Sequence, residues 1–318
     1  MILAKCPLRV SLVGGSTDTQ EFLNKYETGS VISFTPDLYT FVSIHKNNLH
    51  KYIINYSKKE IEEDYQNIKN DVVKLCCEYF DTPHCSITFN SNILSSGSGL
   101  ASSSSFIIST IKALTLFQKI KMTNKEICDI AFQIERRINP LAGQQDVYGC
   151  GVGNFKRIDF NINKPQTYRF LDMSFITDRH DMFLLNTHIV RNSTTILKTL
   201  DLEKSHRLLE TVDDLEQSIL QQNENDFFSI FNKGWYLKKQ TSSEIINNRE
   251  LLDMDTELDN MSSIDGLKLC GAGGGGYFFI MIKKDARNTF LDKIENKFSK
   301  KVLIDISIDS DGVRGAKI

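Results

Sequence analysis

The stretch Ser95-Ser-Gly-Ser-Gly-Leu-Ala-Ser-Ser-Ser-Ser105 decides the fold assignment, because a glycine-serine loop runs directly into an apolar helix pattern. A strand pattern at 86–90 precedes the loop, and a helix is predicted over about 102–118. Unpaired N–H groups and the macrodipole at a helix start favour a phosphate anion. The loop lacks the Gly-Lys-Ser/Thr ending of a Walker A motif, and Ser102 stands where GxGxxG needs its third glycine. Phosphate binding is therefore favoured over a flexible linker.

A second glycine-rich loop lies near the start of the chain. The strand pattern over residues 2–13 runs into Gly14 and Gly15 and then into small polar residues that end at Asp18. Glycines let a backbone approach a ligand closely, and a carboxylate accepts hydrogen bonds from hydroxyl groups. Taken alone, this segment is best interpreted as an ordinary strand that ends in a turn. A ligand-binding role for it depends on the other motifs of the chain.

A third loop, Gly271-Ala-Gly-Gly-Gly-Gly276, satisfies the spacing of GxGxxG. The residues after it, 277–282, read as a strand, whereas a dinucleotide fingerprint needs a helix there. We therefore reject a Rossmann-type site. Five glycines among six residues indicate close approach to another group. A tight hairpin without a ligand is the competing interpretation.

Two acidic residues accompany these loops. A helix is predicted over about 124–138, opened by a capping box at 123–126. Glu135 lies at the edge of its buried stripe, where an unpaired carboxylate is costly. A metal ion, a neighbouring arginine or plain exposure would each relieve that cost. Asp146 lies in a loop predicted at 139–146, where it could be a general base or a turn former.

The remaining pattern separates a strand-rich first half from a helical stretch. Strands are predicted at 31–34, 39–45, 52–57, 152–160, 182–187 and 301–308. The stretch from about 193 to 250 is helical in pattern and indicates a second lobe. The change of pattern divides the chain into two predicted domains, 1–165 and 166–318.

Composition and charge exclude several classes of protein. The 318 residues suit two lobes, and 38 basic against 40 acidic residues leave a formal net charge of −2 without any block of like charge. Neither nucleic acid nor an anionic membrane is therefore an expected partner. Seven scattered cysteines without a CxxC pair argue against a zinc site or disulfide framework and fit a reducing compartment. No secretory signal or membrane-length apolar run is present, so a cytoplasmic location is expected.

Together the three loops resemble the motifs of the GHMP kinases, the superfamily of galactokinase, homoserine kinase, mevalonate kinase and phosphomevalonate kinase. Ser95 through Ser104 match its second motif, Pro-x-x-x-Gly-Leu-Gly-Ser-Ser-Ala. The order of three glycine-rich motifs is more specific than any one of them. The resemblance implies an α+β fold of two lobes. An ATP-binding N-terminal lobe of the ribosomal-S5-like type would precede an α+β C-terminal lobe, with the active site between them.

The resemblance also implies roles for individual residues. Glu135 and Asp146 lie eleven residues apart, which is similar to the spacing of the magnesium glutamate and catalytic aspartate in the mevalonate kinase branch. By that match Ser103 and Glu135 would hold Mg²⁺. Asp146 would be the catalytic base, and Arg9 would sit beside it and keep it ionised. The loop that would wrap the ATP phosphates comprises Gly97, Ser98, Gly99, Leu100, Ala101, Ser102, Ser103 and Ser104.

Within the superfamily, nearly the whole chain is most similar to the D-glycero-D-manno-heptose 7-phosphate kinases of bacterial surface-polysaccharide pathways. The shared motifs are Pro-Leu-Arg-Val-Ser at 7–11, Gly-Gly-x-Thr-Asp at 14–18, Gln-Asp-x-Tyr at 145–148, Thr-x-x-x-Arg-x-Ser at 187–193 and Trp-x-Leu-Lys-Lys at 235–239. This resemblance implies ATP-dependent phosphorylation of the anomeric hydroxyl to a 1,7-bisphosphate. Substrate-binding residues are then Gly14, Gly15, Ser16, Asp18, Asp146, Arg191, Gly273 and Gly274. Arg191, Lys238 and Lys239 are candidates for the distal phosphate.

The chain departs from this pattern at Ser16, Ala101 and Gln144, where glycine is usual, and at Ser95 and Ser96, where proline is usual. Ala101 adds only a methyl group, which stays compatible with ATP binding. Ser16 and Gln144 flank the expected sugar site and leave the sugar open. The alternatives are another GHMP sugar 1-kinase, for galactose, fucose or unphosphorylated heptose, and a non-catalytic sugar or ATP sensor on the same fold. The joint presence of the catalytic and magnesium residues argues against the sensor.

Overall fold

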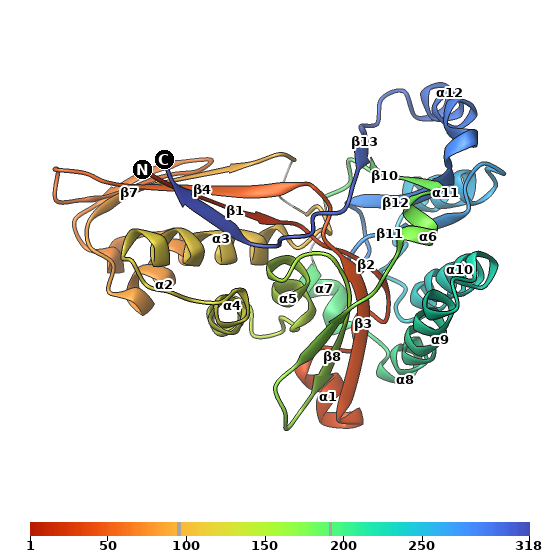
Figure 1. Cartoon of the computed structure of the whole chain (residues 1–318), viewed down its shortest axis with the longest axis horizontal. Helices are drawn as coiled ribbons and strands as arrows, with labels where there is room; N and C mark the ends of the chain where they lie inside the picture. The colour runs from red at the N-terminus through yellow and green to blue at the C-terminus, as the bar shows by residue number, and fades with distance from the viewer. Residues whose placement is uncertain (94–96, 191–192) are drawn as a thin grey trace.

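Three β-sheets organise the molecule (Figure 1). The computed structural model of the chain describes residues 1–93, 97–190 and 193–318, without the side chains of 193–195. The first sheet has the strand order β14-β1-β4-β7-β5-β6, the second β2-β3-β8-β9 and the third β11-β12-β10-β13. Helices pack against each sheet, so the α+β two-lobe fold is confirmed.

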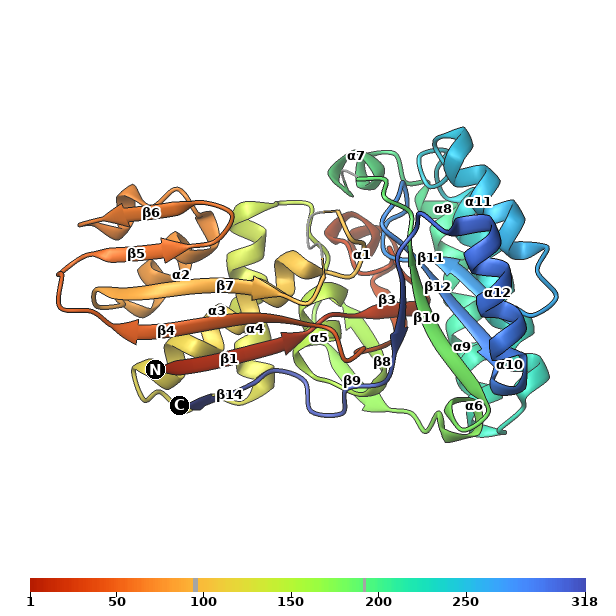
Figure 2. The same ribbon diagram turned by 90° about the horizontal axis from the view of Figure 1, so that it is seen from above.

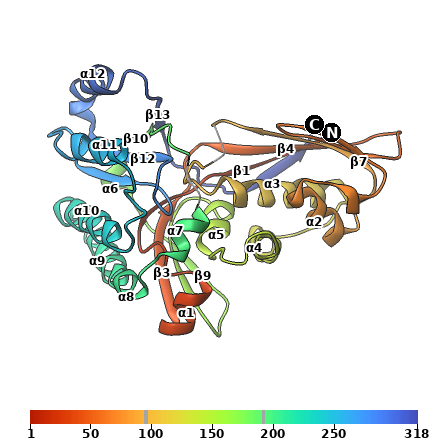
Figure 3. The same ribbon diagram turned by 180° about the vertical axis from the view of Figure 1, so that it is seen from behind.

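The first sheet and three helices form one half of the molecule. Figures 1 and 3 show the helices gathered on one face of this sheet. Their apolar sides bury a common core because the amphipathic stripes face the sheet. The strands are β1 (Ile2–Pro7), β4 (Tyr39–Lys46), β5 (Tyr52–Asn55), β6 (Lys59–Glu62), β7 (Cys85–Ser91) and β14 (Arg314–Lys317), and the helices are α2 (Asp71–Phe80), α3 (Ser102–Phe117) and α4 (Asn124–Ile138). A 3₁₀ turn covers Tyr65–Asn67.

The second sheet joins the two halves. It contains β2 (Val10–Val13), β3 (Thr28–Phe34), β8 (Phe155–Asn161) and β9 (Thr167–Phe170), with α1 (Gln20–Tyr26) and α5 (Gln145–Gly151) beside it. Its apolar side shares a core with the third sheet, since the Phe34 and Phe279 rings lie 5.4 Å apart between centroids. This shared core fixes the two halves relative to each other.

The third sheet carries most of the later helices, as the view from above shows (Figure 2). Its strands are β10 (His180–Asn186), β11 (Gly266–Leu269), β12 (Tyr277–Lys283) and β13 (Leu303–Ile306). The accompanying helices are α6 (Ser174–Thr177), α7 (Ser193–Lys198), α8 (Leu202–His206), α9 (Leu208–Leu220), α10 (Glu224–Gln240), α11 (Arg249–Asp259) and α12 (Arg287–Phe298), with a 3₁₀ turn at Lys284–Ala286. In the described part of the chain, no helix is both long and apolar enough to cross a membrane.

The single strand predicted at 2–13 was wrong, because the chain changes sheets at Leu8 and Arg9. The Leu8 N–H donates to the Leu38 carbonyl at 2.8 Å, and the Arg9 N–H donates to the Leu100 carbonyl at 3.1 Å. These two bonds take the place of the regular strand-to-strand hydrogen bonds, so the strand is interrupted at Leu8 and Arg9. At this break the Arg9 side chain lies against the glycine-serine loop.

Other local predictions had mixed outcomes. The helices at 102–118 and 124–138 are confirmed as α3 and α4, including the capping box between Thr123 and Glu126. The loop predicted at 139–146 was wrong at its end, since α5 begins at Gln145. The short elements α1, α2 and β6 were not predicted. The domain division at residue 165 stays a prediction: β9, just beyond it, pairs with β8, and β14 pairs with β1.

Candidate functional site

A cavity of about 280 Å³ opens where the three glycine-rich loops meet. Polar and charged side chains from both halves of the chain line it, as expected for a ligand site at the junction of two lobes. The predicted site residues among its lining are Arg9, Gly14, Gly15, Ser16, Asp18, Gly97, Ser98, Gly99, Ala101, Ser102, Ser103, Ser104, Glu135 and Asp146. The fold therefore brings together side chains that are more than 130 residues apart in the sequence.

The glycine-serine loop and the loop at 271–276 touch through their backbones. A Cβ added to Gly99 would lie 2.6 Å from the Cys270 carbonyl oxygen, and one added to Gly276 would lie 2.3 Å from the Ser98 carbonyl oxygen. Both glycines also have positive φ, at 82° and 92°. These two glycines are thus required by loop packing. The contact holds the first turn of α3 against the C-terminal half.

The Arg9 guanidinium and the Asp146 carboxylate form the central ion pair. Arg9 Nε and Nη2 donate to Asp146 Oδ1 at 2.9 and 2.7 Å, and Nη1 donates to the Gly99 carbonyl at 2.6 Å. Burial disfavours the charged guanidinium, but Asp146 outweighs that effect and raises the pKa of Arg9. Asp146 stands in the first turn of α5, and about a third of its side chain is exposed toward the cavity. Both bonds end on Oδ1, and no side chain or backbone group of the described residues bonds to Oδ2.

Asp18 presents a second carboxylate to the cavity. Its Oδ2 accepts from the Gln145 N–H at 2.8 Å, whereas Oδ1 is buried and has no hydrogen-bond partner in the described structure. The Gln145 side-chain oxygen beside it is also buried and unpartnered there. Burial raises the pKa of Asp18 to about 6, and the nearby Asp146 adds to the rise. Such orphaned polar atoms indicate a hydrogen-bonding ligand.

Glu135 presents the third carboxylate, from α4. Its Oε1 accepts from the Ser104 hydroxyl at 2.7 Å, and its Oε2 is buried with no partner among the described residues. Burial raises the pKa of Glu135 to about 8, with Asp146 as the next contributor. An unpaired carboxylate oxygen at this depth is costly, so a cation or hydrogen-bond donor fits it.

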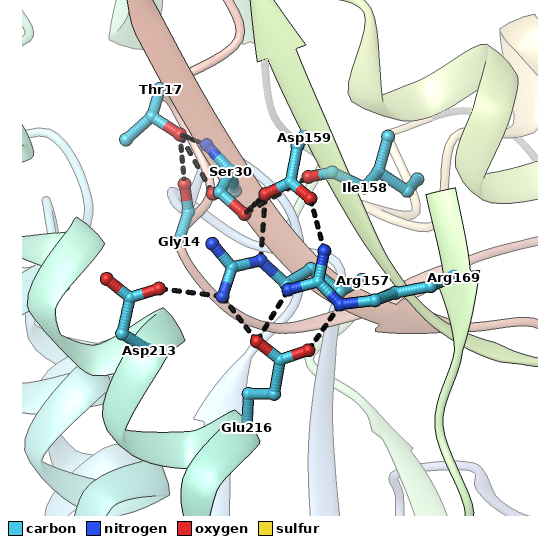
Figure 4. A network of polar contacts seen from close by, with 9 residues as sticks. All are labelled: Gly14, Thr17, Ser30, Arg157, Ile158, Asp159, Arg169, Asp213 and Glu216. Carbon is cyan, nitrogen blue, oxygen red and sulfur yellow. Dashed lines mark hydrogen bonds and ion pairs between the residues drawn. The ribbon is translucent and has the colours of Figure 1, made fainter. Parts of the chain in front are cut away.

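A polar network anchors the loop from Gly14 to Asp18 (Figure 4). The Thr17 hydroxyl donates to the Gly14 and Ser30 carbonyls at 2.8 and 2.9 Å. The Ser30 hydroxyl donates to Asp159 at 2.8 Å, and Asp159 in turn accepts from arginines of β8 and β9. Those arginines bind Glu216 on α9 (Figure 4). The loop is therefore held from both halves of the molecule.

Comparison with known proteins shows which proteins the chain resembles in sequence and fold. Residues 66–154 match the family model of the GHMP kinases N terminal domain. A solved D-glycero-D-manno-heptose 1-phosphate kinase from Bacteroides thetaiotaomicron aligns with a TM-score of 0.81 at 20% identity, covering 100% of this chain and 99% of that one. The chain therefore carries the N-terminal domain of the GHMP kinases at residues 66–154. It is accordingly an ATP-dependent kinase.

Two further relatives align with the chain almost end to end. The D-glycero-alpha-D-manno-heptose 7-phosphate kinase of Campylobacter jejuni is 25% identical, over 100% of this chain and 99% of its own length. The mevalonate kinase of Methanococcus jannaschii aligns with a TM-score of 0.76 at 20% identity, over 97% of this chain and 98% of that one. The resemblance predicted from the three loops is confirmed at the level of the superfamily.

Several predicted site residues do not line the cavity. Gly273 and Gly274 pack against protein, since an added Cβ would lie 2.8 Å from Ile245 Cα and 2.9 Å from Ile196 Cδ1 respectively. Leu100 is fully buried beneath the glycine-serine loop. Arg191 lies outside the described residues. The substrate-binding roles of these glycines and of Arg191 stay predictions.

Other residues reach the cavity without having been predicted from the sequence as site residues. Gln145 faces Asp18, and Lys268 lines the wall. Of the two lysines predicted as candidates for the distal phosphate, Lys238 lines the cavity, whereas Lys239 bonds to Asp255 at 2.7 Å. The two lysines differ only in the side of helix α10 from which they project. Two adjacent lysines in a sequence do not indicate which of them faces the cavity.

The raised pKa of Asp18 predicts a pH-dependent gain of stability in the isosteric variant Asp18→Asn. A carboxyl group whose pKa is raised by folding loses stability as pH rises from about 4 through about 6, and asparagine lacks this loss. The variant should exceed the wild-type free energy of unfolding by about 1–3 kcal/mol at pH 7.5 and by much less at pH 4.5. Urea unfolding at both pH values measures this. The exposed Asp214→Asn is the control, and an equal gain at both pH values would contradict the prediction.

Proposed function

We propose that this kinase transfers the γ-phosphoryl group of ATP to the anomeric hydroxyl of a sugar that already carries a phosphate, D-glycero-D-manno-heptose 7-phosphate. The observation that carries the proposal is the convergence of three carboxylates, Asp18, Glu135 and Asp146, on one cavity at the start of α3. Two of them keep a buried, unpartnered oxygen within the described residues. We propose that Glu135 Oε2 meets a metal ion and that Asp18 Oδ1 accepts a hydrogen bond from a sugar hydroxyl.

The ATP phosphates would lie at the N-terminus of α3. Residues 97–104 surround that helix start, and the macrodipole favours an anion there. A second pocket of about 330 Å³ continues from the same point, since Ser103 lines both cavities. Its walls include Tyr56, Phe89 and Phe106, and the two phenylalanine rings lie 5.5 Å apart between centroids. Flat aromatic walls next to a phosphate site suit the adenine base.

The residues present also fit Mg²⁺. Glu135 Oε2 is a buried carboxylate oxygen without a partner in the described chain, and Ser103 is exposed in the same cavity. Oxygen ligands of this kind are those that Mg²⁺ prefers, together with phosphate oxygens. When bound, the cation would neutralise charge on the β- and γ-phosphates. The Ser104 hydroxyl would hold Glu135 so that Oε2 points toward it.

Asp146 would act as the general base. Arg9 holds Oδ1, so the carboxylate presents Oδ2 to the acceptor hydroxyl and takes its proton as the oxygen attacks phosphorus. The second Arg9 contact, to the Gly99 carbonyl, ties this base to the phosphate loop. Asp18 Oδ1 would accept from another sugar hydroxyl and orient the ring. Positioning of this kind supplies most of the rate in phosphoryl transfer.

Support for the heptose substrate comes from two relatives whose names include a phosphorylated heptose. One is called a heptose 7-phosphate kinase and the other a heptose 1-phosphate kinase, so the names differ in the position of the phosphate. We favour the 7-phosphate because only a sugar whose anomeric hydroxyl is free can give a proton at that position to the proposed base, Asp146. The product would be a 1,7-bisphosphate for surface-polysaccharide precursors, made in the cytoplasm where ATP is available.

A substrate panel tests this proposal. Purified enzyme is given Mg-ATP and one of several acceptors, and ADP release is followed: heptose 7-phosphate, unphosphorylated heptose, heptose 1-phosphate, galactose, fucose and mevalonate. We expect the highest kcat/KM with heptose 7-phosphate and a product phosphorylated at the anomeric position by phosphorus NMR. Turnover only with unphosphorylated sugars would overturn the substrate assignment. ATP binding without transfer to any acceptor would favour a sensor.

A further inference from the structure

Two lysines of the C-terminal half reach the wall of the catalytic cavity. Lys238 comes from the last turn of α10 and Lys268 from β11, and each side chain is more than nine-tenths buried. Lys238 Nζ donates to Ser16 Oγ at 2.5 Å, and Lys268 Nζ donates to the Leu12 carbonyl at 2.8 Å. Both contacts fall on the segment that leads to Asp18. The two ammonium groups therefore lie along the acceptor side of the cavity.

Two other cations, Lys238 and Arg9, lie close enough to Lys268 to affect its charge. Burial lowers the pKa of Lys268 to about 7; the Cys270 thiol opposes this, while the cations Lys238 and Arg9 add to it. Of these, Arg9 is paired with Asp146. The Leu12 carbonyl takes one of the three hydrogens of the Lys268 ammonium group, which leaves two more that can donate. A dianion in this position would compensate the cationic cluster and favour the charged form of Lys268.

Ser16 supplies a hydroxyl at the same position. Its φ of 78° lies in the left-handed region, which is unfavourable for a side chain other than glycine, and its side chain is buried. Strained residues of this kind concentrate at ligand clamps. The hydrogen bond to Lys238 holds the Ser16 hydroxyl at the cavity wall. A glycine here, as in the family pattern, would remove both the strain and the hydroxyl.

We propose that Lys238, Lys268 and Ser16 form a subsite for the phosphate monoester that the acceptor sugar carries before the reaction. The inference rests on the proposed function and adds to it the residues that select a phosphorylated sugar. The γ-phosphate of ATP has the same chemistry and is the competing source. Both lysines bond the Leu12–Ser16 segment next to Asp18, which assigns them to the acceptor.

The test compares one sugar with and without its phosphate. Lys238→Met, Lys268→Met and Ser16→Gly are assayed with heptose 7-phosphate and with the same heptose unphosphorylated. Loss of a charge-assisted hydrogen bond should lower kcat/KM for heptose 7-phosphate about ten- to hundredfold in either lysine variant, mainly through KM. The value for the unphosphorylated heptose and the KM for ATP should stay within about twofold of wild type. Ser16→Gly should give a smaller loss of the same kind.

Lys239→Met is the matched control. It removes a neighbouring lysine that bonds to Asp255 and faces Trp235 at 5.3 Å from the ring centroid, away from the cavity lining. It should keep the wild-type preference for the phosphorylated heptose. Turnover of the unphosphorylated sugar also reports on folding, so a misfolded lysine variant is recognised by loss of both activities together with a lowered melting temperature.

Two outcomes would overturn the subsite. Unchanged preference for the phosphorylated heptose in both lysine variants would do so directly. Equal losses with both sugars in a variant that melts like wild type, together with a raised KM for ATP, would assign the lysines to the transferred phosphoryl group instead. Failure of the proposed function looks different, because the wild-type enzyme itself would then show no preference for heptose 7-phosphate.

Discussion

Asp146→Asn should abolish most turnover while leaving ATP binding intact. Asparagine keeps the shape of the side chain and one oxygen that can accept from Arg9, but it cannot take a proton from the acceptor hydroxyl. Loss of a general base of this kind lowers kcat by about 10²–10⁴-fold. Steady-state kinetics measure the loss, and titration with a fluorescent ATP analogue measures the nucleotide affinity.

The control for this variant is Asp214→Asn on α9, whose exposed carboxylate lies 3.9 Å from Lys233. It should keep wild-type kcat. Should Asp146→Asn retain more than about a tenth of wild-type kcat, positioning and charge neutralisation would account for the rate and Asp146 would not be the base. Arg9→Lys adds a further check: lysine cannot bridge Asp146 and the Gly99 carbonyl at once, so kcat should fall without a matching change in KM for ATP.

Glu135→Gln should raise the Mg²⁺ concentration needed for half-maximal rate by more than about a hundredfold. The amide keeps the side-chain volume and removes the anionic oxygen proposed to meet the cation. Ser104→Ala should give a milder rise of about tenfold, because it leaves the carboxylate but removes the hydroxyl that orients it. A magnesium titration at saturating ATP and acceptor measures both effects.

A matched control is Glu295→Gln on α12, an exposed glutamate far along the chain from the cavity residues. Its magnesium titration should coincide with that of wild type. If Glu135→Gln gave the same curve while remaining folded, the cation would be held by other groups. If Ser104→Ala matched wild type although Glu135→Gln did not, the Ser104 hydroxyl would have a structural role only.

The parts of the site that follow from local sequence were predictable. A capping box and a regular apolar stripe specify α4 by themselves, and the stripe brings Glu135 close to the core. The order of the three glycine-rich loops specified the fold as well. Asp146 was predicted because its spacing from Glu135 resembles that in the mevalonate kinase branch, although its helix α5 is too short to leave a periodic signal.

The rest depends on tertiary contacts that no local pattern contains. In the first turn of α3, neighbouring serines point about 100° apart, so the sequence could not tell that Ser104 faces Glu135 and that Ser103 stays exposed. The glycines at 273–274 resemble a ligand-binding backbone, but their lack of side chains makes room for Ile196 and Ile245. Lys268 stands in an ordinary apolar strand pattern, and only the packing of β11 against the Leu12 segment brings it to the cavity.

The strand β14 has a consequence for how the enzyme is made. It pairs with β1, and the Ile318 N–H bonds to the Met1 carbonyl at 2.9 Å, so the first and last strands lie side by side (Figure 2). β14 therefore emerges from the ribosome only after the elements that precede it, and until then β1 lacks one neighbour and keeps an open edge. The first sheet therefore stays incomplete until β14 has been made, and an unpaired strand edge of this kind is prone to aggregation before then.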